Sequence, residues 1–246
     1  MRIDIWSDIV CPFCYVGKRN LEQALAEFEH RDEVEVVWHS FELDPSATEH
    51  PAGSLPEMIA GKYQMPLEQA IASQESLAER AREVGLDFNW RQARYGNTFD
   101  AHRVIHYAAE QGLASAAQEA FKLAYFTQGR SVQDHESILD IASEIGLDTA
   151  EVEAVLKSDR YAADVRADEQ LARQLGINGV PFFLIESKWA VSGAQPAKML
   201  VQALRQVWEE THRVEFLNPL AGAAGDAAGN NAAEAGPSCD MNGNCS

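Results

Sequence analysis

The chain has 246 residues, of which 46% are hydrophobic and 24% charged, and its formal net charge is −18. This length and composition predict a globular protein with a substantial core. The acidic charge disfavours nucleic acids and anionic membranes as partners, and no apolar stretch is long enough to span a bilayer. Because Asp4 interrupts what would be the apolar part of a secretion signal, we expect the protein in the cytoplasm, where cysteine pairs tend to be catalytic, redox-sensing or metal-binding.

Residues 1–43 predict a strand, a helix and a second strand. Residues 2–6 alternate between polar and apolar side chains, and residues 33–41 are rich in β-forming types, so both are expected to be strands. Between them, apolar residues at three- and four-residue spacing predict an amphipathic helix that begins at Pro12, since proline suits the first helical position. Cys11 is therefore the expected N-cap, and a Cys-Pro-Phe-Cys motif opens the helix.

Residues 44–157 predict an all-helical insertion domain. After a loop from Asp44 to Pro56, apolar faces predict helices near residues 66–85, 98–112, 114–128, 134–145 and 149–157. The spacing of these helices has no fixed period, so we do not expect an array of repeats.

Residues 158–216 return to a mixed pattern. They predict a helix over 159–175, a hairpin of two strands at 182–185 and 189–192, and a final helix from Pro196. The element order is therefore β-α-β, helical insertion, α-β-β-α, in which 1–43 and 158–216 form one discontinuous α/β domain. Residues 217–246 are expected to be a flexible tail, because most of it is Ala, Gly, Asn and acidic residues.

The position of Cys11 and Cys14 predicts thiol redox chemistry. A helix N-terminus stabilises a thiolate, and Cys11 at the cap should gain most from it. Cys11 is therefore the expected nucleophile and Cys14 the resolving thiol. Zinc is the competing interpretation, since this spacing is half of a common four-ligand site, but no convincing second half is present and we expect no metal. Val180-Pro181, just before the hairpin, suggests a constrained peptide bond beside the cysteines.

Four stretches of the chain resemble the FrnE-like branch of the DsbA-family thiol–disulfide oxidoreductases. They are Asp4–Lys18 with its CPFC motif, Asn97–Arg103, Tyr125–Arg130 and Gly179–Phe183, in the same order along the chain. The resemblance covers about residues 1–214. It implies an α/β thioredoxin fold with a large helical insertion.

The resemblance also implies the redox centre and its alternatives. Cys11, Cys14 and a cis Pro181 match the family's site, and Phe13 and Val180 are expected to line the substrate groove with Pro181. Glutathione-dependent 2-hydroxychromene-2-carboxylate isomerases and kappa-class transferases are similar in fold to this family but carry Ser at the position of Cys11. DsbA itself has His where this chain has Phe13, so we expect a less oxidising couple than DsbA.

The leading prediction is a protein disulfide oxidoreductase or isomerase that acts on protein or small-molecule disulfides. It needs no bound cofactor, and its partners would be thiol- or disulfide-containing proteins, with low-molecular-weight thiols or a reductase for recycling. A glutathione-dependent isomerase or transferase, and a thiol-independent chaperone with an apolar groove, remain the alternatives.

Several other residues allow a functional and an ordinary interpretation. His102 and His106 are four residues apart on a helix and could share a metal, although ordinary helix-face histidines are favoured. Asn97 and Arg103 could line the groove or serve a helix cap and a salt bridge. Asp8 could relay protons, but a solvated loop carboxylate is favoured.

The tail carries a second pair, Cys239 and Cys245. A flexible linker would let this auxiliary pair exchange with the Cys11–Cys14 pair as an intramolecular shuttle. The alternatives are a local disulfide or metal clip, and an inert tail. Four cysteines allow three pairings, of which Cys11–Cys14 with Cys239–Cys245 is the expected one.

Overall fold

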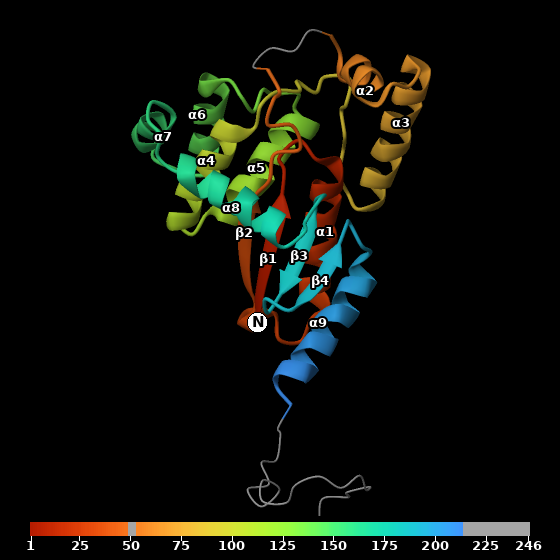
Figure 1. Cartoon of the computed structure of the whole chain (residues 1–246), viewed down its shortest axis with the longest axis vertical. Helices are drawn as coiled ribbons and strands as arrows, with labels where there is room; N and C mark the ends of the chain where they lie inside the picture. The colour runs from red at the N-terminus through yellow and green to blue at the C-terminus, as the bar shows by residue number, and fades with distance from the viewer. Residues whose placement is uncertain (49–52, 214–246) are drawn as a thin grey trace, which may run out of the picture. The chain divides into compact units, whose positions relative to one another are not determined.

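The computed structural model describes residues 1–48 and 53–213 (Figure 1). A four-stranded mixed sheet lies at the centre of residues 1–211. Its strands are β1 (Arg2–Ser7), β2 (Glu35–Ser40), β3 (Phe182–Ile185) and β4 (Trp189–Ser192), in the order β2-β1-β3-β4. β1 is parallel to β2 and antiparallel to β3, and β3 and β4 form the expected hairpin.

Helices join and cover these strands. They are α1 (Pro12–Glu27), α2 (Leu55–Tyr63), α3 (Leu67–Glu83), α4 (Phe99–Glu110), α5 (Ala114–Phe126), α6 (His135–Glu144), α7 (Thr149–Leu156), α8 (Ala162–Gln174) and α9 (Ala197–Thr211), with a 3₁₀ turn at Arg31–Glu33. The order β1-α1-β2, then α2–α7, then α8-β3-β4-α9 confirms the predicted α/β thioredoxin fold with its large helical content.

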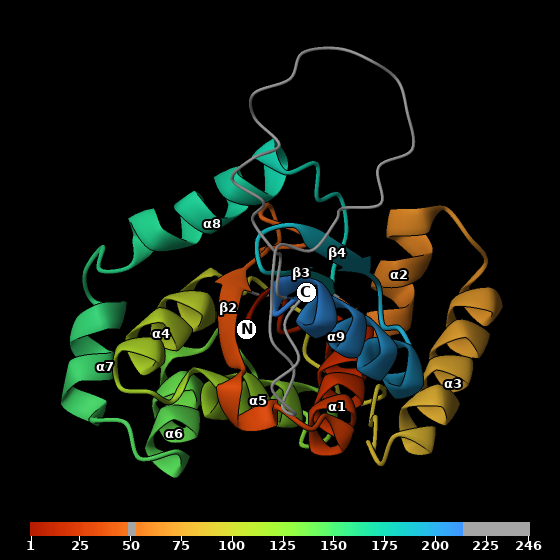
Figure 2. The same cartoon turned by 90° about the horizontal axis from the view of Figure 1, so that it is seen from below.

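The two faces of the sheet are buried separately. Ile3 and Ile5 of β1 point to one face and pack with Leu21 of α1 and Leu204 of α9. Trp6 points to the other face and packs with residues of α8 and the segment that follows it. Figure 2 shows α1 and α9 on one side of the sheet and α8 on the other. The alternation along β1 is the two-residue period of a strand covered on both sides.

Helices α3–α7 enclose a second hydrophobic cluster, which also includes two residues near the cysteine motif. Val104, Phe121 and Ile138 are fully buried there, and Ile9 and Tyr15 belong to the same cluster. The five helices predicted within 66–157 are therefore confirmed. α2 lies outside the individual helices that the sequence predicts, because the sequence indicates a loop as far as Pro56. A capping box formed by Ser54 and Glu57 instead starts a helix there.

Two other findings concern possible membrane spans and the C-terminal tail. In residues 1–48 and 53–213, no helix combines the length and apolar character that crossing a membrane requires. Cys239 and Cys245, and the rest of the predicted tail from residue 217, lie outside the described residues.

Candidate active site

Cys11 and Cys14 occupy the N-terminus of α1, and both are free thiols. Cys11 is the N-cap with extended backbone, Pro12 occupies the first turn, and the N–H of Cys14 donates to the Cys11 sulfur over 3.3 Å. The carbonyl of Cys11 accepts from the N–H of Tyr15 at 3.3 Å, which closes the first helical turn. The expected N-cap is confirmed, and both sulfurs are almost fully buried.

The Val180-Pro181 peptide bond is cis, as the resemblance implies. It lies against the thiols, since the carbonyl oxygen of Val180 is 3.6 Å from the Cys11 sulfur. The prolyl ring rests on α1 at Gly17, where an added Cβ would come within 2.8 Å of the Pro181 Cγ. Glycine at position 17 therefore allows the loop before β3 to approach the helix that carries the cysteines.

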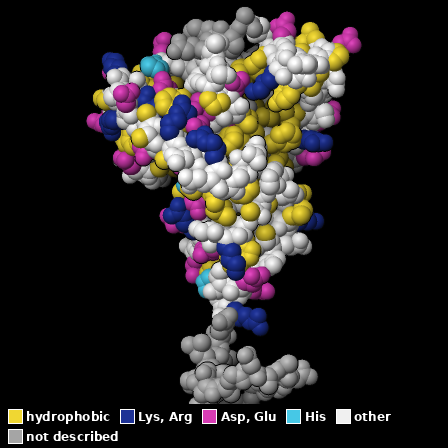
Figure 3. Space-filling view, viewed as in Figure 1, with side chains coloured by type: hydrophobic (Ala, Val, Ile, Leu, Met, Phe, Trp, Pro, Cys, Tyr) yellow, Lys and Arg dark blue, Asp and Glu magenta, His cyan; other side chains and the backbone are white. Residues whose placement is uncertain are grey.

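An apolar groove of about 510 Å³ opens beside Cys11. Phe13 is 45% exposed and lines it, as does Val180. The other side chains come mainly from α2, α3 and the loops before them, and include Val10, Leu43, Leu55, Met58, Ile59, Tyr63, Met65, Leu77, Tyr95, Tyr125 and Phe126. Figure 3 shows hydrophobic side chains gathered on this face, between α2–α3 and the rest of the molecule. Of the predicted groove residues, Phe13 and Val180 line the groove directly, while Pro181 lies behind Val180 on Gly17.

Asp8 is not a solvated loop carboxylate, because it is only 1% exposed. Its carboxylate accepts from the backbone N–H of Leu43 at 2.8 Å and lies 3.4 Å from Nε2 of the buried His102. Burial opposes ionisation, but the hydrogen bonds from His102 and Leu43 outweigh it and hold the pKa of Asp8 below its usual range. A negative charge thus lies three residues before the first cysteine, inside the protein.

Lys122 of α5 is a second ionisable group buried near the cysteines. It is not identified from the sequence. It is fully buried, and its Nζ donates to the Asp8 backbone carbonyl at 3.1 Å and to Gln118 at 2.7 Å. The same Asp8 carbonyl accepts from the N–H of Cys11 at 3.4 Å, so one oxygen joins the lysine to the cysteine motif. The signal was present in the sequence, since Lys122 directly follows Phe121 on the apolar face of its helix.

The two thiols differ in acidity. A hydrogen bond to Cys14 and burial raise the pKa of the Cys11 thiol well above its ordinary value. Burial opposes ionisation of Cys14 as well, but the hydrogen bond from Cys11 and the positive charge of Lys122 lower the pKa of Cys14. This differs from the expectation that the helix end favours the Cys11 thiolate. These two directions favour ionisation of the inner sulfur of Cys14 over that of Cys11, which lines the groove.

The remaining candidates have structural partners. His102 pairs with Asp8, whereas His106 lies 3.2 Å from Asp168, so the two do not share a ligand site. In the described part of the chain, no cluster of His, Cys, Asp and Glu could hold a metal ion. Asn97 accepts from the N–H of Phe99 at the start of α4.

Arg103 also has a structural role. It forms an ion pair with Asp100 at 2.7 Å and donates to the carbonyl of Arg160 at 2.9 Å, and to two further carbonyls at the end of α7. Arg103 therefore joins α4 to the segment between α7 and α8, and the salt-bridge interpretation describes it better than a place in the groove.

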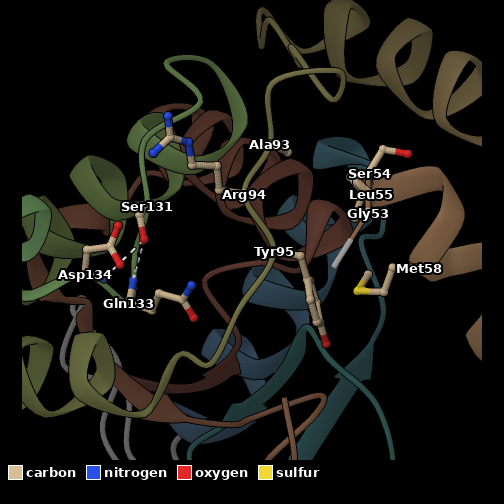
Figure 4. A pocket seen from close by; sticks show the side chains of 10 residues that line it. All are labelled: Gly53, Ser54, Leu55, Met58, Ala93, Arg94, Tyr95, Ser131, Gln133 and Asp134. Carbon is tan, nitrogen blue, oxygen red and sulfur yellow. Dashed lines mark hydrogen bonds between the residues drawn. The ribbon is translucent and has the colours of Figure 1, made fainter. Parts of the chain in front are cut away.

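A smaller cavity of about 240 Å³ lies on the helical part (Figure 4). It is lined by Ser54 and Met58 on one side and by Arg94, Ser131 and Asp134 on the other. It contains no thiol, and the N–H of Asp134 is already bonded to Ser131. Of these two cavities, the groove beside Cys11 is the one with a thiol in its lining.

Comparison with known proteins agrees with this geometry. The chain is 42% identical to a probable DsbA oxidoreductase of Streptomyces coelicolor, with a TM-score of 0.83 over 100% of this chain and 98% of that one. Two more distant structures share the fold. A 2-hydroxychromene-2-carboxylate isomerase has 17% identity and a TM-score of 0.63, over 86% of this chain and 98% of that one. The cytosolic disulfide reductase DsbM of Pseudomonas aeruginosa, solved with GSH, has 20% identity and a TM-score of 0.59, over 83% and 100%.

A family model matches most of the chain. The model of the DSBA-like thioredoxin domain matches residues 2–205, which include the cysteine motif, helices α1–α8 and the β3–β4 hairpin. The chain therefore belongs to the DSBA-like thioredoxin domain family.

Proposed function

We propose that this protein is a thiol–disulfide oxidoreductase that uses Cys11 and Cys14 on protein or small-molecule disulfides. The observation that carries the proposal is the position of Cys11, which caps a helix, contacts the carbonyl of Val180 and lines an apolar groove. A peptide chain in that groove would place its own sulfur beside Cys11. The chemistry needs no bound cofactor, because the two cysteines carry the electrons.

Reduction of a substrate disulfide would proceed in two exchanges. Cys11 passes its proton to the Cys14 thiolate and attacks one substrate sulfur, so that an S–S bond to Cys11 forms and the other substrate sulfur leaves as a thiolate. That thiolate takes the proton from Cys14. Cys14 then attacks the sulfur of Cys11 and releases the second substrate sulfur, which takes a proton from water. The two electrons move to the substrate, and the Cys11–Cys14 disulfide remains.

The reverse sequence would oxidise a substrate dithiol, and recycling would need a thiol or a reductase. DsbM, solved with GSH, shares the fold and is described as cytosolic, which supports low-molecular-weight thiols as partners and the cytoplasm as the compartment. Cys239 and Cys245 remain proposed as an auxiliary pair that exchanges with Cys11 and Cys14.

A glutathione-dependent isomerase or transferase is the second candidate. Its support is the apolar groove, which has room for a small aromatic molecule, and the fold shared with the hydroxychromene carboxylate isomerase. The cysteine at position 11 favours the oxidoreductase, because the resemblance places Ser there in the isomerase and transferase branches.

Reduction of insulin by the wild type, Cys11→Ser and Cys14→Ser decides between them. The oxidoreductase requires that Cys11→Ser abolish turnover and that Cys14→Ser trap a mixed disulfide on Cys11. If both variants retain glutathione-dependent turnover of a hydroxychromene carboxylate while insulin is not reduced, the isomerase is correct. Suppression of aggregation that survives both substitutions, without either turnover, would identify a chaperone.

A further inference from the structure

Lys122 is a buried cation whose ammonium group contacts no carboxylate directly. Its side chain is fully buried, and the acceptors of its Nζ are a backbone carbonyl and an amide oxygen. In residues 1–48 and 53–213 no ion pair joins it to a carboxylate. Lys18 of α1 shows the contrast, because it is almost as buried but forms ion pairs at 2.5 Å with Glu22 and Glu119. A buried ammonium without a counter-ion is costly.

The groups that face Lys122 identify what could balance it. They are Cys14, Cys11 and Lys18 from α1, and Asp8 from the segment between β1 and α1. The Asp8 carboxylate is already bonded to Leu43 and lies against His102 of α4, and it offers Lys122 its backbone carbonyl instead. Burial lowers the pKa of Lys122. The charge of Cys14 counteracts this effect most strongly, followed by the charge of the Asp8 carboxylate.

We propose that Lys122 is the counter-ion of the thiolate that the Cys11–Cys14 pair carries when reduced, and that it thereby makes the pair more oxidising. The inference rests on the proposed function and deepens it. Above the pH of the first ionisation of the reduced pair, the disulfide takes two electrons and one proton from a substrate dithiol and becomes one thiol and one thiolate. The substrate forms its own disulfide and releases its second proton to water.

The charge of Lys122 thus favours one side of this reaction. Beside the disulfide the more weakly acting Asp8 carboxylate offsets part of this charge, whereas the reduced pair adds a thiolate. Lys122 therefore stabilises the reduced protein and raises the reduction potential. Lys122 belongs to α5, whereas both cysteines belong to α1. Tyr15 and Lys18 of α1 bond to Glu119 of α5, and Figure 2 shows the two helices side by side. Lys122 is accordingly a positioning residue that the helical insertion contributes to the redox centre.

The test compares the wild type with Lys122→Met, which keeps the length of the side chain and removes its charge. The first readout is the equilibrium constant for reduction of the Cys11–Cys14 disulfide by glutathione. We expect Lys122→Met to lower it about tenfold or more, which corresponds to about 30 mV. The second is the titration of the thiolate absorbance near 240 nm, in which the first ionisation of the reduced pair should move up by about one pH unit. Both use a background in which Cys239 and Cys245 are Ser.

Lys18→Met is the matched control, because it also removes a buried positive charge but one that carboxylates balance. We expect it to change the equilibrium constant less than threefold. The inference is overturned if Lys122→Met leaves both readouts within twofold of the wild type, or if Lys18→Met lowers the equilibrium constant as much. If the wild type shows no Cys11-dependent insulin reduction, the proposed function fails. The thiolate titration still tests Lys122 in that case.

A measurement on the wild type covers the case in which Lys122→Met does not fold. With ¹³C-labelled lysine, the inference requires one lysine signal that loses its proton at lower pH in the disulfide form than in the reduced form, because coupling between two sites is reciprocal. Identical titrations of every lysine in the two forms would contradict it.

Discussion

His39 joins three elements by one ring, and its removal gives a sharp test of the fold. Its Nδ1 lies 2.6 Å from Asp168 of α8, its Nε2 lies 2.8 Å from Asp4 of β1, and its ring stacks on Trp6 with centroids 4.4 Å apart. Both nitrogens can donate only when the ring is protonated. Burial opposes that charge, but the hydrogen bonds and charges of Asp168 and Asp4 outweigh it and raise the pKa of His39.

The substitution His39→Gln leaves one of the two carboxylates without its donor. Breaking a buried ion pair costs about 3–5 kcal/mol. The Asp168 carboxylate keeps the backbone N–H of Ser40 at 2.8 Å and the nearby His106, and the side chain of His39 is 13% exposed. We therefore expect a smaller loss in the free energy of unfolding, about 2–3 kcal/mol at pH 6.

The effect has a defined pH dependence. Since the folded pKa of His39 lies above its unfolded value, its contribution is complete below about pH 6.5 and is lost as the pH rises through the folded pKa. The folded pKa values of Asp4 and Asp168 lie below their unfolded values. Burial opposes this in both, but hydrogen bonds from Arg2 and His39 outweigh it at Asp4. Hydrogen bonds from His106 and His39 outweigh it at Asp168. Their contribution is complete above about pH 4 and is lost as the pH falls.

Urea unfolding of the oxidised protein between pH 4 and 9 measures this, and the disulfide keeps Cys11 and Cys14 from titrating. The difference between wild type and His39→Gln should be largest near pH 5–6 and should shrink as the pH rises. His135→Gln is the control, since His135 pairs with Asp100 at 2.9 Å but is 52% exposed, and it should cost less than about 1 kcal/mol. A loss below about 0.5 kcal/mol for His39→Gln at pH 6, or one that grows towards pH 9, would refute the reasoning.

Three further predictions concern the site. Gly17→Ala should cost about 1–3 kcal/mol in chemical denaturation and slow insulin reduction, because its Cβ would lie 2.8 Å from the Pro181 ring; an unchanged midpoint and rate would contradict this. Phe13→His should raise the equilibrium constant for reduction by glutathione severalfold at pH 6, since it adds a cation beside the thiols, and Phe13→Leu should not. Replacement of Cys239 and Cys245 by Ser should slow exchange at Cys11 if the auxiliary pair is a shuttle, whereas an unchanged reoxidation rate would exclude it.

The features that the sequence predicts correctly are local ones. The N-cap at Cys11, the hairpin and the helices of the insertion depend on patterns a few residues long. The cis Pro181 was predicted because it belongs to a motif that the family shares. The sequence does not predict that Asp8 is buried, because its burial depends on His102 and Leu43, which come from two other segments.

The acidity of the thiols was not predictable for the same reason. Helix position alone favours a thiolate on Cys11, but the charge that acts on Cys14 comes from Lys122, more than a hundred residues later in the chain. A lysine within an apolar helix face is the pattern that could have identified it, since such residues are rarely buried without a partner.

The shared cluster formed by Ile9, Tyr15 and the helical block has a consequence for protein engineering. Tyr15 is 1% exposed and stacks on Phe88, with centroids 6.0 Å apart, and it directly follows the second cysteine. A shortened chain that lacked residues 44–157 would expose this ring and Ile9 to water, because the other buried members of their cluster lie between Ala78 and Leu156. Residues 44–157 are therefore needed to bury the side chains next to the cysteine motif. Transplanting only the motif and the four-stranded sheet onto another scaffold would leave these helices out.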